Sequence, residues 1–153
     1  MDRAEAEPDP DRLLLDLTGR PTPPLVQVRR WAVTAMADLD DDHLQAVLLV
    51  ATELVANAYD HAHPHRVRLR RSRVPCQVRI EVEDTSPARP ILGRSRLGEH
   101  RGRGLVMVDN LTRHQWGTQA RSDGGTGKTV WAVTSCDGDE WTPCGPRDRA
   151  GPP

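Results

Sequence analysis

The sequence has no phenylalanine, one lysine against twenty arginines, and a net charge of only −1 over its 153 residues. The excess of arginine indicates the coding bias of a GC-rich genome before it indicates a function. A net charge so close to zero gives no reason, in the bulk composition, to expect nucleic acid or a membrane surface as a partner. The length is that of one domain with a single core.

Long apolar runs are also missing. None approaches the roughly 18 residues of a membrane span, and the acidic N-terminus lacks the apolar stretch of a signal peptide. We therefore expect a cytoplasmic protein that does not associate with membranes. The three cysteines, Cys76, Cys136 and Cys144, are odd in number and far apart, so their spacing predicts neither a disulfide framework nor a zinc site.

Hydrophobic periodicity predicts one strand, two helices, two strands, a long loop, one helix and two strands. The expected strands cover 13–19, 65–72, 76–83, 114–120 and 128–134, and the expected helices cover 24–38, 43–61 and 104–111. Asp41 or Asp42 is the expected N-cap of the second helix. We expect a disordered segment over 1–11, a domain over 12–135 and a flexible tail over 136–153. Neighbouring antiparallel strands favour an α+β two-layer sandwich, with helices on one face of a mixed, mostly antiparallel sheet.

The tripeptide Gly127-Lys128-Thr129 matches the end of a phosphate-binding P-loop. The full P-loop pattern needs a glycine five residues before Gly127, where this chain has Ser122. A P-loop also opens a helix, whereas the residues that follow, TVWAVT, alternate and favour a strand with Val130 and Ala132 on one face. The tripeptide therefore needs another explanation.

The second expected helix is apolar on nearly every side between residues 46 and 58, which predicts that it is buried. Glu53 and Asn57 interrupt this run and lie four residues apart, hence on one face. They form either a polar pair satisfied within the core or the wall of a cavity that holds water, substrate or a metal. An asparagine carbonyl oxygen suits a hard cation such as Mg²⁺.

Two further features flank a loop of about twenty residues, which inside a compact domain is usually functional. Asp84 ends a strand and begins this loop, where its carboxylate can accept from an amino group or simply start a turn. Gly102 and Gly104 come immediately before the expected third helix. Such glycines let backbone amides approach an anion at the positive end of a helix, and Arg101 and Arg103 add charge.

The order and spacing of four segments are more specific than any one of them: ELVANAYDHA, EVEDTSPARP, RGRGLVMVDNL and WGTQARSDGGTGKTVWA. Together they resemble the GHKL ATPase/kinase superfamily, in particular the anti-sigma-factor serine/threonine kinases and their actinobacterial ATP-binding relatives. The resemblance covers about residues 13–135. It implies a Bergerat-type sandwich, bound ATP and Mg²⁺, a sigma factor and an antagonist protein as partners, and a possible homodimer.

The resemblance also implies roles for single residues. Glu53 would be the general base and Asn57 the Mg²⁺ ligand, and Asp84 would accept from the adenine amino group. Thr129, rather than Lys128, would lie beside the adenine. The remaining implied contacts are His61, which closes the Glu53–Asn57 box, the phosphate-binding segment Arg101, Gly102, Arg103, Gly104 and Leu105, and the sigma-contacting Arg29 or Arg30.

One departure from the family keeps an alternative open. The second nucleotide box usually reads Asp-x-Gly-x-Gly, but here Asp84 is followed by Thr85-Ser86-Pro87 without either glycine. A nucleotide-binding switch with little or no kinase activity, which acts by partner binding alone, is therefore the second hypothesis. A third hypothesis is the catalytic domain of a sensor histidine kinase. Against it, this sequence shows no upstream dimerisation helices with a phosphoacceptor histidine.

The arginine-rich strand HRVRLRRSR does not favour nucleic acid. Alternation with Val67 and Leu69 places Arg66, Arg68 and Arg70 on one solvated face. No aromatic residue lies among them to stack on a base. We expect a charged sheet surface and no nucleic-acid partner.

Overall fold

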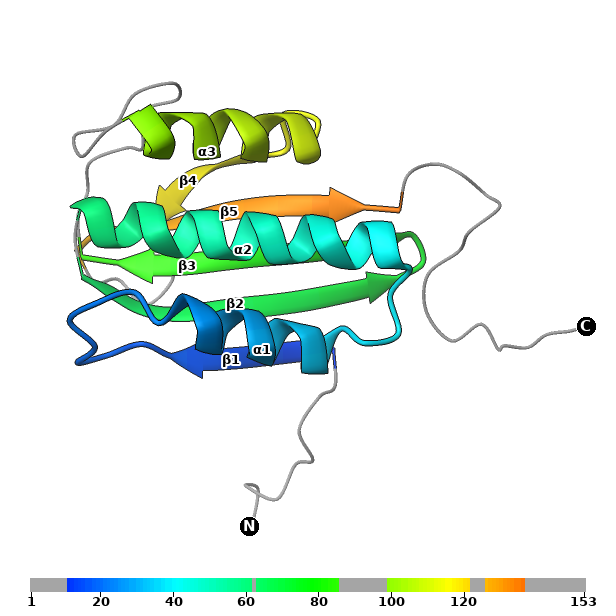
Figure 1. Ribbon diagram of the computed structural model, residues 1–153, viewed down its shortest axis with the longest axis horizontal. Coiled ribbons are helices and arrows are strands. Elements are labelled where there is room, and N and C mark those ends of the chain that lie inside the picture. Colours follow the sequence, from blue (N-terminus) through cyan, green and yellow to red (C-terminus); the bar gives the residue numbers. More distant parts are fainter. Residues whose placement is uncertain (1–10, 62, 86–98, 122–125, 137–153) are drawn as a thin grey trace, which may run out of the picture.

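A computed structural model describes residues 11–61, 63–85, 99–121 and 126–136 of the chain. Five strands and three helices occur there in the predicted order (Figure 1). The strands are β1 (Arg12–Asp16), β2 (Pro64–Arg73), β3 (Cys76–Asp84), β4 (Trp116–Ala120) and β5 (Lys128–Ser135). The helices are α1 (Leu25–Ala35), α2 (Asp41–His61) and α3 (Glu99–Leu111). Apart from Asp11 and Cys136, the segments expected to be disordered or flexible lie outside the described residues.

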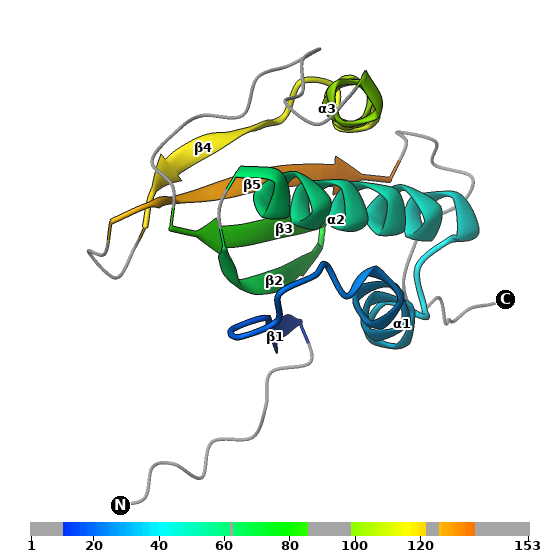
Figure 2. The same ribbon diagram turned by 60° about the vertical axis from the view of Figure 1, so that its left-hand side comes forward.

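The strands form one sheet in the order β1-β2-β3-β5-β4. Each of the described pairings is antiparallel, so the sheet contains none of the parallel pairing that a mixed sheet would have. Figure 2 shows all three helices on the same side of this sheet. The predicted α+β two-layer sandwich is confirmed.

The core lies between the two layers, and the periodicity of each element explains it. Helix α2 turns one face inward at intervals of three and four residues, and β3 and β5 contribute every second residue. The fully buried members of these three elements include Val47, Val50, Leu54, Val78, Ile80, Val82 and Ala132. Helix α2 packs on α1, α3, β3 and β5, and therefore occupies the middle of the helical layer.

Several element boundaries differ from the prediction by one to five residues: α1 ends at Ala35 rather than 38, β1 ends at Asp16 rather than 19, and β4 begins at Trp116 rather than 114. Helix α2 begins at Asp41, and the backbone N–H of Asp42 donates to the Asp40 carboxylate at 3.2 Å. Asp40 is therefore the capping residue, and Asp41 and Asp42 lie in the first turn, where acidic side chains favour the positive end of the helix dipole. Helix α3 begins at Glu99, five residues before the expected start.

The face of the sheet opposite the helices carries the predicted row of arginines. Arg66 and Arg68 form ion pairs with Glu83 at 3.2 and 3.3 Å, and Arg70 pairs with Glu81 at 3.3 Å. Both glutamates are about 95 % buried beneath these side chains. The arginines are thus committed to neighbouring strands, as expected of a charged sheet surface.

Candidate functional site

Four elements that carry predicted site residues meet at one end of the molecule. The C-terminal end of α2, the last residue of β3, the first residue of β5 and the start of α3 all lie at the left of Figure 1. The register pairs Asp84 with Lys128 across β3 and β5, and α2 packs on both strands and on α3. Antiparallel pairing thus brings together segments that are more than forty residues apart in the sequence.

Asn57 and Glu53 lie on α2 where the prediction placed them. The Asn57 side chain is only 5 % exposed. Burial of an amide costs free energy unless it is hydrogen-bonded, so an asparagine held inside a largely apolar helix is a candidate contact for a ligand or water. Glu53, one turn earlier, is half-buried and has a partner. His61 is the last residue of α2, and its side chain lies outside the described residues.

Asp84 is 1 % exposed at the end of β3, and its carboxylate lies 3.1 Å from the ammonium group of Lys128. Lys128, itself 5 % exposed, was not predicted as a site residue. The sequence could have predicted its orientation, because Lys128, Val130 and Ala132 alternate along one strand and therefore lie on the same face of the sheet, which packs on the helices. The only lysine of the chain is therefore part of the candidate site.

Thr129 lies on the other face of the sheet. It pairs with Glu83 in the β3–β5 ladder, and successive side chains of a strand point to opposite faces. Its side chain lines a hollow of about 310 Å³ on the arginine-bearing face, together with Glu81 and Glu83. The structure therefore does not bring Thr129 and Asp84 together, although the resemblance placed both beside the adenine.

The conformation of Gly127 explains why the tripeptide Gly127-Lys128-Thr129, which resembles the end of a P-loop, begins with glycine. Its φ is +102°, and a Cβ added to it would lie 2.1 Å from the carbonyl oxygen of Asp84. Only glycine fits this close approach of the β5 start to the β3 end. The strand that follows also confirms that the tripeptide does not open a helix.

The glycines expected to precede α3 lie inside it. Glycine inside a helix lowers the stability of that helix by about 1 kcal/mol relative to alanine, a cost that a helix can tolerate. The amides of the N-cap and of the next three residues lack intrahelical acceptors, so with Glu99 as the first helical residue these amides end at Arg101, directly before Gly102. The side chains of Arg101 and Arg103 lie outside the described residues, and Leu105 is 1 % exposed in the interior.

Near the candidate site, one described titratable group has a shifted pKa. Burial raises the pKa of Tyr59, two residues after Asn57, and the nearby Arg20 charge lowers it by less. The Tyr59 hydroxyl is buried and has no hydrogen-bond partner within the described residues. Tyr59 is therefore neutral at physiological pH and available as a donor.

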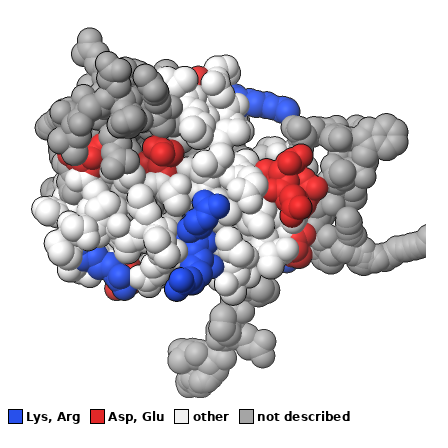
Figure 3. Space-filling view, viewed as in Figure 1, with Lys and Arg blue, Asp and Glu red and all other residues white. Residues whose placement is uncertain are grey.

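Arg29 and Arg30 lie away from this end of the molecule. Both are exposed on α1, and Figure 3 shows basic side chains gathered over that helix. No helix of the described residues is long and apolar enough to cross a membrane.

A comparison with protein families identifies the family of the chain. The profile of the histidine kinase-like ATPase domain matches residues 18–134 of the 153. The chain belongs to this family. It is thus a GHKL-type ATPase domain, of the superfamily that includes anti-sigma-factor kinases, and the five-stranded sheet with three helices is consistent with the Bergerat fold. Domains of this kind bind ATP, usually with Mg²⁺, which suggests ATP-dependent kinase activity. No curated protein matches the chain.

Proposed function

We propose that this chain is a regulatory serine/threonine kinase of the anti-sigma type, with residues 12–135 as its nucleotide-binding domain. It would bind MgATP, phosphorylate a serine of a small antagonist protein and sequester a sigma factor. The observation that supports this most directly is the burial of Asn57, which is 5 % exposed on the largely apolar helix α2, one turn after Glu53. The resemblance of the segment ELVANAYDHA would make Asn57 the magnesium ligand.

The residues present fit a magnesium ion. Mg²⁺ takes few protein ligands and keeps several waters and phosphate oxygens, so one amide oxygen is a sufficient protein contribution. When bound, the ion neutralises charge that develops on the phosphates. Asn57 would hold it, and the first turn of α3, which ends beside Gly102, would offer backbone amides to a phosphate.

Glu53 would act on the attacking hydroxyl. A serine hydroxyl is a poor nucleophile at neutral pH, and a positioned carboxylate that takes its proton assists the attack. The serine oxygen forms a bond to the γ-phosphorus, the bond from that phosphorus to the bridging oxygen breaks, and ADP leaves. The proton passes from the serine to Glu53. Asp84, at the end of β3, would accept from the adenine amino group.

A second candidate function is a nucleotide-binding switch without useful kinase turnover. Two observations favour it: the missing glycines after Asp84, and the ion pair that Asp84 makes with Lys128. Adenine would have to share Asp84 with this lysine, which weakens affinity. The output of the protein would then be partner binding alone.

The exposed arginines of α1 are the proposed contact for a sigma factor. Arg29 and Arg30 have side chains in solvent, and a charged surface steers association with an oppositely charged partner. Such partners are cytoplasmic, so the protein would act in the cytoplasm. A homodimer is part of the same proposal.

Calorimetric titration with ATP, with and without Mg²⁺, tests the nucleotide site. We expect Mg²⁺-dependent binding by the wild type and its loss in Asn57→Ala, with the far-ultraviolet circular dichroism unchanged. The matched control is Thr52→Ala on the same helix, since the Thr52 hydroxyl donates to backbone carbonyls of that helix, those of Leu48 at 2.8 Å and Leu49 at 3.2 Å. A wild type that does not bind ATP at millimolar concentration contradicts both candidate functions.

Glu53→Gln separates the kinase from the switch. We expect this variant to bind MgATP as the wild type does, because the amide keeps the shape of the side chain, and to lose transfer of the γ-phosphate to the antagonist protein. General-base assistance contributes typically about 10²–10⁴-fold, so transfer should fall within that range. Equal and negligible transfer by both proteins, with ATP binding intact, favours the switch.

A further inference from the structure

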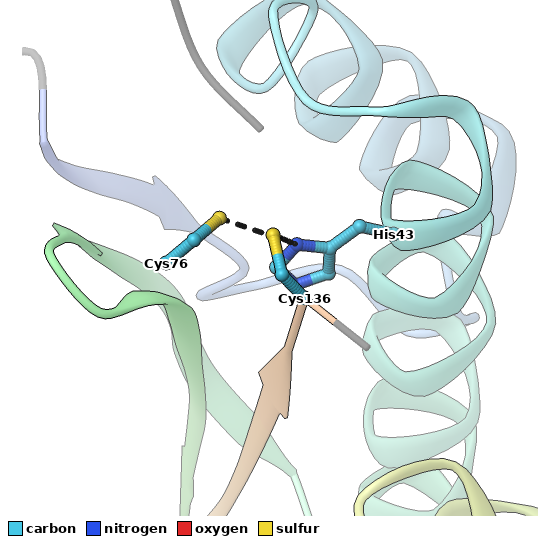
Figure 4. A group of neighbouring side chains, drawn as sticks. All are labelled: His43, Cys76 and Cys136. Atoms are coloured by element: carbon cyan, nitrogen blue, oxygen red, sulfur yellow. Dashed lines mark hydrogen bonds between the residues drawn. The ribbon is translucent and has the colours of Figure 1, made fainter. Parts of the chain in front are cut away.

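His43, Cys76 and Cys136 gather at the end of the molecule opposite the candidate nucleotide site (Figure 4). We propose that these three residues form a metal site for a thiolate-preferring divalent ion of the zinc class. The nitrogen and sulfur atoms that would act as ligands all lie within 4.8 Å of one another. The wide spacing of the cysteines argued against a zinc site in the sequence, but ligands supplied by three separate elements leave no local spacing pattern.

Secondary structure fixes the position of each ligand. His43 is in the first turn of α2, Cys76 is the first residue of β3, and Cys136 directly follows β5. The backbone N–H of Cys136 donates to the Cys76 carbonyl at 3.0 Å, which continues the β3–β5 ladder by one pair. The His43 side chain is 4 % exposed, and both cysteines are half-buried without a disulfide between them. The site is thus built from regular structure, not from mobile side chains.

The separations between the atoms suit a tetrahedral ion. The sulfur of Cys76 lies 3.6 Å from Nδ1 of His43, and the sulfur of Cys136 lies 3.7 Å from the same nitrogen. Zn–S bonds of about 2.3 Å and Zn–N bonds of about 2.05 Å at the tetrahedral angle separate sulfur from nitrogen by about 3.6 Å. The two sulfur–nitrogen separations match this value, and the two sulfurs lie within 4.8 Å of each other, against about 3.8 Å around a bound ion.

Thr134 completes the arrangement from behind the histidine. Its hydroxyl oxygen lies 2.8 Å from Nε2 of His43 and is buried. If Nε2 carries the proton and donates to this oxygen, the lone pair of Nδ1 points toward the two sulfurs. A ligating histidine almost always has such a partner on its other nitrogen, which fixes the tautomer and the ring orientation.

The donor atoms identify the class of ion. Two sulfurs and an imidazole select Zn²⁺ and other soft or borderline ions, whereas Mg²⁺ and Ca²⁺ require oxygen. On binding, each thiol releases its proton to solvent, and the two thiolates neutralise the divalent charge. Three protein ligands leave the fourth position for water.

The site joins the start of α2 to the adjoining ends of β3 and β5, and so holds the helical layer against the sheet. It is distinct from the proposed magnesium site, because His43 and Asn57 are separated by about 21 Å along the same helix. The proposal therefore does not depend on nucleotide binding. Zinc should raise the melting temperature of the protein whether or not ATP is present.

Metal analysis of the purified full-length chain, followed by titration with Zn²⁺ and with Co²⁺ as a coloured substitute, is the first test. We expect one ion per chain and the thiolate-to-metal absorption of tetrahedral Co²⁺. Cys76→Ser, Cys136→Ser and His43→Gln should each lose binding, and Thr134→Val should weaken it about 10–100-fold. His114→Gln, which changes an exposed histidine elsewhere, is the matched control and should bind as the wild type does.

Alkylation of the unaltered protein supplies a readout that does not depend on any variant folding. Zinc should protect Cys76 and Cys136 from iodoacetamide, and a chelator should restore their reaction, as mapped by peptide mass. Cys144 serves as an internal control and should react equally in both conditions. The proposal is overturned if the wild type binds no Zn²⁺ or Co²⁺, or if zinc protects all three cysteines alike.

Discussion

Asp84 and Lys128 face each other across the paired strands β3 and β5, with their charged groups 3.1 Å apart and both side chains almost fully buried. The carboxylate proposed to recognise adenine is therefore already engaged by a cation of the same sheet. A buried ion pair contributes little net stability, but removal of one partner is costly because the other charge stays buried. The pair thus links the stability of this end of the sheet to the chemistry of the proposed pocket.

Lys128→Met should lower the free energy of unfolding by about 3 kcal/mol, because it leaves Asp84 charged in a buried position without its cationic neighbour. Urea denaturation of the wild type, Lys128→Met, Asp84→Asn and the double variant gives the coupling between the two residues. We expect the double variant to be more stable than the sum of the single effects by at least about 1 kcal/mol. Additive effects would show that the two side chains do not interact.

Substitutions on the two faces of the sheet should change the affinity for ATP by different amounts. Asp84→Asn should weaken ATP binding about 10–100-fold, since a hydrogen bond to a charged group contributes about 1.5–3 kcal/mol. Thr129→Val should change it less than about 2-fold, because Thr129 lies on the opposite face from Asp84. Isothermal titration of both variants measures this difference. The family resemblance assigned an adenine contact to Thr129, and a large loss in Thr129→Val would favour that assignment instead.

Gly127→Ala should destabilise the protein far more than Gly19→Ala. Both glycines have a positive φ, of +102° and +81°, so both substitutions pay for an unfavourable backbone conformation, about 1–2 kcal/mol each. Only at Gly127 would the added carbon collide with another backbone atom, whereas nothing lies within 4 Å of it at Gly19. We expect a difference of at least about 2 kcal/mol between the two variants in chemical denaturation. Equal losses would mean that β3 and β5 separate easily at this end.

The pair of Asp38 and Arg71 should make stability depend on acid pH. Burial, the largest influence, raises the pKa of Asp38, but hydrogen bonds from Arg71 and Arg73 and the Arg71 charge outweigh it and leave the pKa below its ordinary value of 3.8. A lowered pKa contributes stability that is present above the ordinary value and is lost as the pH falls through the lowered one.

The corresponding variant is Asp38→Asn. It should cost about 1 kcal/mol at neutral pH, the upper range for exposed pairs, because the Asp38 side chain is 43 % exposed although that of Arg71 is only 2 % exposed. Denaturation at a series of pH values should show this difference shrinking below about pH 4. A difference that stays constant into strong acid would exclude the carboxylate charge as its cause.

Local periodicity was enough to predict the order of the elements, because each helix and strand buries one face and repeats that face along the chain. The ends were less predictable. Helix α3 runs through Gly102 and Gly104, since tertiary packing of residues such as Leu105 and Val108 outweighs the low helix propensity of glycine. Asp40 caps α2 in preference to its two acidic neighbours, which only the local geometry determines.

The candidate site was predictable where its residues share one element. Glu53 and Asn57 lie on one helix, so their spacing alone placed them on one face. Lys128 was missed because a family pattern was read residue by residue without regard to the face on which each side chain lies. The three ligands of the proposed metal site were out of reach, since pairing of β3 with β5 and docking of α2 bring them together.

The contact between Gly127 and the backbone of Asp84 has a consequence for how related sequences are interpreted. Any other residue at this position would force apart the two strands on which the whole sheet is centred. A glycine here would therefore persist in relatives that have lost every trace of nucleotide chemistry, for the same steric reason that it persists in active ones. Its presence is a marker of the architecture, and activity has to be judged from Glu53, Asn57 and Asp84.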